Sequence, residues 1–368
     1  MKNVALFPFC KEYYPLVKHF NNLQKNYHLA DVIEPLGIGL NNEDISQICN
    51  HPPINIKAFD EIDFSNNAWD ILLLLNSHNH LDLDERVFIE LAEKAISFGK
   101  KVEYIVNEVT ELSKDFSMLD QHYPNQIQIF VDSNYAYERD DLLGSISEIR
   151  LDIPIILIGG LVQESDILEI LFSLKEQFNK AGKRCSVFTR TISDYIFGFH
   201  NYSGILSQQN KDEASKIDEL KYYFQFYSYY DCPDIILVEA PDALMKYNEM
   251  TSNGYGILSY MLCQAVSFDA IICSAPLELA IPSFIRAVNF ELERRLKTSL
   301  AAVHVSNIII DSADMLQSRK VTYTHTTMER VNKHLNIIEN TSSIPMFNII
   351  DDSAYKLYEY LCQEYMEE

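Results

Sequence analysis

The sequence predicts an α/β protein with two domains, each built on a parallel β-sheet. Short apolar runs alternate with longer amphipathic segments, a pattern typical of strands that alternate with helices. The chain has 368 residues, which is enough for two hydrophobic cores. A polar, acidic stretch at 133–149 interrupts the alternation and is the candidate linker. We therefore place the domains at 1–145 and 151–368.

The first domain has the pattern of a Rossmann-like fold. The expected elements are, in order, strand 4–9, helix 12–23, strand 29–34, strand 71–76, helix 84–98, strand 102–106 and strand 127–131. A dinucleotide-binding domain carries GxGxxG after its first strand, but Phe7-Pro8-Phe9-Cys10 stands there. Gly37 and Gly39 lack a third glycine, and we interpret them as a turn.

The second domain shows a stronger pattern of the same kind. Its expected elements are strand 153–158, helix 164–181, strand 185–189, strand 233–239, strand 268–276, helix 277–297, strand 302–306, strand 346–349 and helix 353–366. The first strand runs directly into Gly159-Gly160, and the helix after it returns through AGKRCSVF. This opening unit resembles that of P-loop NTPases related to dethiobiotin synthase and the ParA/MinD ATPases.

The candidate phosphate loop comprises Gly159, Gly160, Gln163, Glu164, Ser165 and Asp166. A working loop places a lysine beside the β/γ-phosphates and a Ser or Thr on Mg²⁺. Counted from either glycine, this loop supplies no lysine and places carboxylates there instead. A helix N-terminus favours an anion by only ~0.3–1 kcal/mol, so two carboxylates outweigh it. We interpret the loop as a degenerate Walker A motif, and expect Mg²⁺ only if a nucleotide binds.

Two alternative interpretations of this loop remain. Arg190 could fold into the site, or a cation could bridge Glu164 and Asp166, and either would restore phosphate binding. Alternatively, the two carboxylates simply complement the dipole of the helix that they precede.

Polar side chains also follow the other strands of the second domain, at the edge where α/β proteins bind ligands. The candidate crevice residues are Arg190, Thr191, Asp194, His200, Glu239 and Asp242. Glu239 stands where a Walker B acid is expected and could hold a metal with Asp242. Alternatively, such a strand-end carboxylate caps a helix or pairs with Lys246. His200 could act as a base or ligand, or simply pack among aromatic residues.

No metal site is assigned. His78, His80, Asp82 and Asp84 could bind zinc, but no further ligand is identifiable. The seven cysteines form no CxxC pair, so we expect free thiols in a reducing compartment. The net charge of −23 argues against nucleic acid and anionic membranes as partners. With no apolar run near ~20 residues, we expect a cytoplasmic protein.

Several segments together resemble the clostridial-type peptide maturation system proteins, which accompany radical SAM enzymes and small ribosomal peptides. These segments are 4–9, Gly159-Gly160, Phe197-Gly198-Phe199-His200, 233–243, 268–276 and 343–352. The resemblance implies an accessory role in making a modified peptide, with the precursor peptide or the modifying enzyme as partner. A second copy of the chain, giving a homodimer, is a further candidate partner.

Two other function classes remain. One is a nucleotide-dependent enzyme, ligase- or kinase-like, that uses Glu239 and Arg190 with an atypical phosphate loop. The other is a small-molecule-binding module that uses the crevice of the first domain.

Overall fold

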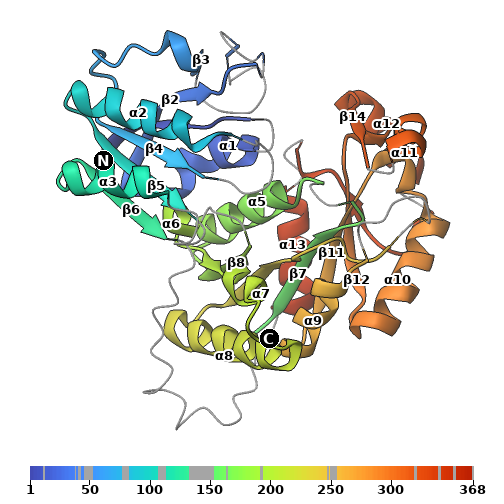
Figure 1. The fold of residues 1–368 in the computed structure, drawn as a ribbon. Helices are drawn as coiled ribbons and strands as arrows, with labels where there is room; N and C mark the ends of the chain where they lie inside the picture. The colour runs from blue at the N-terminus through green and yellow to red at the C-terminus, as the bar shows by residue number, and fades with distance from the viewer. Residues whose placement is uncertain are drawn as a thin grey trace. The chain divides into compact units, whose positions relative to one another are not determined.

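The chain forms two compact units in the computed structural model (Figure 1). The first unit comprises Met1–Leu142 and Thr191–Gly204, and the second comprises Leu143–Arg190 and Ile205–Glu368. The structure describes residues 1–10, 13–37, 39, 43–44, 53–76, 83–106, 113–131, 153–162, 165–190, 194–246, 248, 255–318, 321–338, 341–350 and 354–366.

The sheet of the first unit has the strand order β3-β2-β1-β4-β5-β6, and all its paired strands are parallel. This order is that of a Rossmann fold, as the sequence predicts. The strands are β1 (Lys2–Phe7), β2 (Tyr27–Glu34), β3 (Ile56–Ala58), β4 (Ile71–Leu75), β5 (Lys101–Val106) and β6 (Ile127–Val131). The helices are α1 (Tyr14–Leu23), α2 (Glu85–Ser97) and α3 (Lys114–His122). Of these elements, the short edge strand β3 and helix α3 were not predicted.

The segment 191–204, which sequence analysis assigned to the second domain, is grouped with the first unit. It contains α6 (Asp194–Phe197) and β9 (His200–Asn201). The ring of Phe197 lies 5.8 Å from that of Phe20 in α1, and the Gln24 side chain donates a hydrogen bond to the Ile196 carbonyl. These contacts with α1 and its end explain the grouping.

The sheet of the second unit runs in the order β15-β12-β11-β7-β10-β8, again with parallel pairs throughout. In Figure 1, β7 lies between β8 and β11. The strands are β7 (Ile155–Gly160), β8 (Cys185–Thr189), β10 (Ile235–Glu239), β11 (Ala270–Ala275), β12 (Leu300–Val305) and β15 (Met346–Phe347). The first five are buried along their whole length, which explains why they read as continuous apolar runs. The predicted α/β class with an NTPase-like second sheet is confirmed.

Helices cover the strands of this second sheet. They are α5 (Ile167–Lys180), α8 (Glu213–Asp231), α9 (Ile257–Ala265), α10 (Pro282–Leu296) and α13 (Ala354–Tyr365). Helix α13 packs against α5, while α8 and α10 both pack against α9. The single helix expected at 277–297 is divided into the 3-10 turn η5 (Leu277–Leu279) and α10. Pro282 is the cause, because proline fits the first turn of a helix but not its interior.

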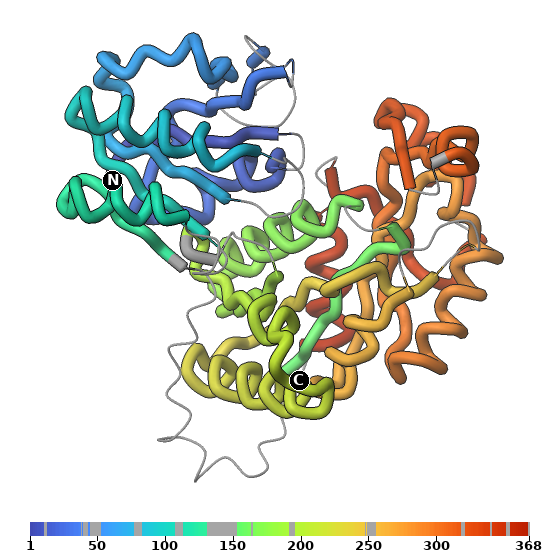
Figure 2. Tube along the Cα trace, viewed as in Figure 1, coloured from blue at the N-terminus to red at the C-terminus, as the bar shows by residue number. Residues whose placement is uncertain are grey.

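A further group of elements separates β12 from β15 and was not predicted. It comprises β13 (Ile308–Ile310), α11 (Ser312–Ser318), β14 (Tyr323–His325) and α12 (Met328–Ile338). Strands β13 and β14 form an antiparallel pair, and Val331 of α12 packs against Leu277, Ala280 and Val305. These elements lie close together at one end of the unit (Figure 1 and Figure 2).

The connections of the second sheet reverse direction at β7. From β7 the chain reaches β8 and then β10 on one side, and it reaches β11, β12 and β15 on the other. Such a switch point, at the carboxyl ends of the strands, is where open α/β sheets bind ligands. In the described part of the chain, no helix has the length and apolar character to cross a bilayer.

Candidate functional site

Three residues lie side by side at the carboxyl ends of the central strands of the second unit. In the register of the sheet, Ser274 of β11 pairs with Gly160 of β7 on one side and with His304 of β12 on the other. Neighbouring residues in register project from the same face of a sheet. The N-terminal end of α5 reaches this face, because Asp166 contacts His304. Gly160, Ser274 and His304 therefore define the candidate site together with the start of α5.

The loop after β7 closes tightly over Gly160. A Cβ atom placed on Gly160 would overlap the Ser165 hydroxyl and the Val162 carbonyl. The Ser165 Oγ donates a hydrogen bond of 2.8 Å to the Val162 oxygen, and Ser165 is fully buried. Ser165 and Val162 therefore pack directly against Gly160. Gln163 and Glu164 lie outside the described residues.

Gly159 lies close to the segment that follows β10. An ideal Cβ at this position would lie 2.7 Å from the Cβ of Ala240, in the segment that follows β10. The amide of Leu244 donates a hydrogen bond of 2.9 Å to the Gly160 carbonyl. The two glycines thus allow the segment after β10 to approach β7, which is a packing role.

Asp166, which is partly exposed, pairs with the buried His304. Its Oδ2 lies 3.1 Å from the His304 Nε2, and the His304 side chain is fully buried. The Ile349 amide donates to the His304 Nδ1 at 3.2 Å, so this nitrogen carries no proton and Nε2 donates to Asp166. Asp166 precedes α5 with a left-handed backbone (φ 51°) and does not cap the helix with its side chain. Its carboxylate is therefore held at the start of α5 by a histidine.

The Ser274 hydroxyl is buried, and within the described part of the chain it has no hydrogen-bond partner. Serine, histidine and aspartate thus occur together, as they do in hydrolase triads. Both His304 nitrogens are occupied, however, one by Asp166 and one by the Ile349 amide. The imidazole therefore has no free nitrogen to accept the serine proton, and the arrangement is not a catalytic triad.

Glu239 ends β10, next to β7, and is buried. Its Oε2 accepts a hydrogen bond of 3.0 Å from the Arg190 amide. Burial raises the pKa of the Glu239 carboxyl to about 6, and the Arg190 charge and amide lower it only in part. The Arg190 guanidinium donates to the carbonyl oxygen of Pro241. The structure thus brings the Glu239 carboxylate next to the backbone of Arg190.

Asp242 caps a helix. Its carboxylate accepts hydrogen bonds from the amides of Leu258 (3.2 Å) and Ser259 (2.9 Å) in the first turn of α9, and from the Ser259 hydroxyl (2.6 Å). From the sequence, helix capping was the alternative for Glu239, whereas the structure shows it for Asp242. Among the described residues no three His, Cys, Asp or Glu side chains are grouped to hold a metal ion.

The other predicted site residues lie elsewhere or outside the described residues. His200 belongs to β9, in the segment grouped with the first unit. Thr191 and the side chain of Asp194 are outside the described residues, as are His78, His80 and Asp82. Asp84 caps α2 by accepting from the Arg86 amide at 3.0 Å.

Sequence reasoning missed Ser274 and His304. The available signal was their position, because each is a polar residue near the carboxyl end of an otherwise apolar strand. Neither residue belongs to a motif, so nothing in the local sequence distinguished them from core residues.

The sequence matches no protein-family model, and no curated protein matches it. The structure is similar to the crystal structure of a DUF1611 family protein from Anabaena variabilis, with a TM-score of 0.64 and 10% sequence identity. That similarity covers 99% of this chain and 100% of the other. At this identity it shows a common fold.

The apo form of a GTPase from Pyrococcus abyssi aligns with 58% of this chain and 99% of its own, at 10% identity. Its TM-score of 0.30 is too low to support an argument.

Proposed function

We propose that this protein is a cytoplasmic accessory protein in the maturation of a ribosomally made peptide. It binds the precursor peptide, or the radical SAM enzyme that modifies it, and does not hydrolyse nucleotides. The observation that supports this proposal best is the close packing of Ser165 and Val162 against Gly160, at the start of the candidate phosphate loop. The link to peptide maturation comes from the sequence resemblance described above.

Electrostatics at the same loop also disfavour a nucleotide. The carboxylate of Asp166 is held at the start of α5, where a phosphate would have to sit. Two unit charges ~4 Å apart repel by about 4 kcal/mol at an effective dielectric constant of ~20. The helix N-terminus stabilises an anion by only ~0.3–1 kcal/mol. A polyphosphate would therefore gain less from the helix than it loses to Asp166.

The surface offers features that suit a peptide or protein partner. The net charge of −23 attracts basic segments and speeds their association. Tyr229 and Tyr230 of α8 are 66% and 75% exposed, and Tyr260 of the adjacent α9 is 47% exposed. Tyrosine is enriched at protein interfaces, because it supplies a large apolar area with a polar end.

Isothermal titration of the purified protein with ATP and GTP, each with and without Mg²⁺, tests the absence of nucleotide binding. The proposal expects no detectable heat of binding in any of the four titrations. Micromolar binding would contradict it and would favour the enzyme described next. The peptide role is tested separately by co-purification with the product of each neighbouring gene, and binding to none of them would contradict it.

One observation favours a second candidate function, that of a nucleotide-dependent enzyme. Glu239 is a buried carboxyl with a pKa raised to about 6, at the switch point of the sheet and beside Arg190. Perturbed carboxyls in such positions are common in catalytic sites. In that case Glu239→Gln should abolish turnover while the circular dichroism spectrum stays unchanged. Turnover by E239Q at the wild-type rate would remove Glu239 from the mechanism.

A further inference from the structure

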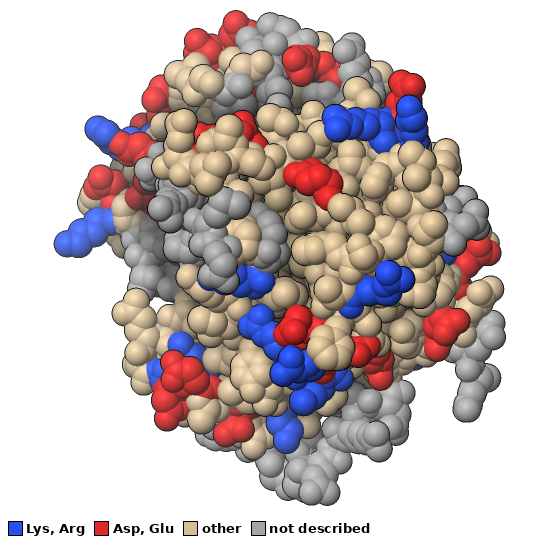
Figure 3. All heavy atoms as spheres, turned by 90° about the vertical axis from the view of Figure 1, so that its right-hand side faces the viewer, with Lys and Arg blue, Asp and Glu red and all other residues tan. Residues whose placement is uncertain are grey.

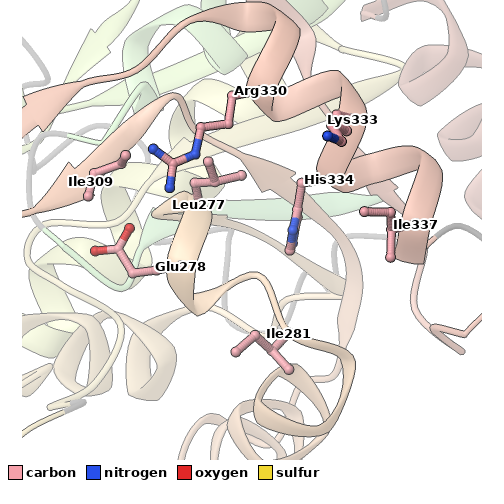
Figure 4. Close-up of a pocket in the computed structure, with 8 residues that line it drawn as sticks. All are labelled: Leu277, Glu278, Ile281, Ile309, Arg330, Lys333, His334 and Ile337. Carbon is pink, nitrogen blue, oxygen red and sulfur yellow. The ribbon is translucent and has the colours of Figure 1, made fainter.

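A pocket of about 320 Å³ lies in the second unit, between η5, β13 and α12 (Figure 4). Four aliphatic side chains form its apolar wall, namely Leu277, Ile281, Ile309 and Ile337. Leu277 follows β11 by two residues, and β13 follows β12 with only two residues between them. The pocket is therefore built outside the carboxyl ends of two central strands, where α/β proteins bind ligands.

Two cationic side chains also line the pocket. Arg330 and Lys333 both come from α12 and are three residues apart, so they share one face of the helix. Both reach the pocket from the same side as His334 (Figure 4). Within the described part of the chain, neither forms an ion pair. Both residues are exposed, so a ligand in the pocket can reach their charged groups.

The other polar residues of the pocket already have partners. The His334 Nε2 donates to the Ala280 carbonyl at 2.8 Å, so this nitrogen is not available to a ligand. Glu278 accepts a hydrogen bond from the Ile310 amide. Its negative charge disfavours a dianion such as phosphate more than it disfavours a monoanion. Figure 3 shows that basic and acidic side chains are scattered among uncharged residues over the face of the molecule that it displays.

We propose that this pocket binds a carboxylate that is attached to an apolar group. Arg330 and Lys333 contact the carboxylate, and the four aliphatic side chains contact the apolar group. Two sources supply this chemistry, the C-terminal residue of a peptide and a small organic acid. The inference does not rest on the proposed function, because no residue of the loop over Gly160 lines the pocket.

The test is titration calorimetry with three probes. N-acetyl-L-leucine carries the free carboxylate, N-acetyl-L-leucinamide is its uncharged match, and a decapeptide ending in leucine carries the same group at a C-terminus. We expect at least one carboxylate probe to bind, and the amide to bind at least about tenfold more weakly. Binding of the acid alone identifies a small-molecule site, and binding of the peptide identifies C-terminal recognition. Equal binding of acid and amide, or no binding of either carboxylate at millimolar concentration, would overturn the inference.

Matched variants locate the binding. The double variant Arg330→Ala/Lys333→Ala should weaken carboxylate binding by about tenfold or more. The control Arg294→Ala/Lys356→Ala removes the same charges from α10 and α13 and should leave the affinity within about twofold. Glu278→Gln keeps an acceptor for the Ile310 amide and should tighten binding several-fold. Equal loss in both double variants would refute the assignment to this pocket.

Discussion

Replacing Glu239 with Gln should remove a pH dependence from the stability of the second unit. Burial raises the pKa of the Glu239 carboxyl from 4.5 to about 6 in the folded protein, against the opposing effect of Arg190. In the unfolded chain the carboxyl is solvated and titrates near its ordinary value. The folded state therefore holds this proton more tightly than the unfolded state does.

The direction of the effect follows from this difference. Below pH 4.5 the carboxyl is protonated in both states, and its contribution to stability is fully present. As the pH rises through about 6, the folded state must accommodate a buried charge and the contribution is lost. The difference between 4.5 and about 6 corresponds to about 2 kcal/mol of unfolding free energy. Because glutamine does not titrate, E239Q should gain about 2 kcal/mol relative to wild type between acidic and neutral pH.

Urea unfolding of both proteins at about pH 4.5 and about pH 8, followed by circular dichroism, measures this difference. Tryptophan fluorescence would report the wrong unit, because the single tryptophan, Trp69, lies in the first. Glu293→Gln, an exposed change on α10, is the control. A difference between E239Q and wild type that stays the same at the two pH values, within about 0.5 kcal/mol, would refute the reasoning.

Two further substitutions test contacts of the candidate site. His304→Ala should lower the unfolding free energy by about 3 kcal/mol or more, because it leaves a cavity and removes the partners of Asp166 and of the Ile349 amide. A loss below about 1 kcal/mol in urea unfolding would show that His304 and Asp166 do not pair. Asp242→Ala should cost about 0.5–2 kcal/mol through loss of the α9 cap, and Asp242→Asn should cost less because its oxygen still accepts. Equal losses in thermal unfolding for the two variants would contradict the capping role.

The fold class and the central strands were predictable because burial on both faces leaves a local signal. Strands such as β4 and β7 are short, continuous apolar runs, and glycines or polar residues bound them. The absence of a lysine in the loop after β7 is likewise a property of the sequence alone. It led directly to the prediction of a degenerate phosphate loop. The division of 277–297 was also within reach, since Pro282 marks the start of a helix.

Contacts between residues far apart in the chain had no such signal. The pairing of Asp166 with His304 joins residues separated by 138 positions, and either residue alone looks like an ordinary polar side chain. The assignment of 191–204 to the first unit depends on the packing of Phe197 against Phe20. These choices follow from which apolar and polar surfaces meet after the sheets have formed.

The sequence by itself thus determined two parallel sheets, the order of their main strands along the chain, and the lack of a cationic phosphate loop. The tertiary structure decided that Ser165 packs against Gly160, that Asp166 contacts His304, and that Asp242 caps α9. It also formed the pocket of Arg330 and Lys333 by bringing α12 beside η5. The physical reason is that strand and helix patterns arise from neighbours in the chain, whereas a site depends on side chains that meet only when distant segments pack.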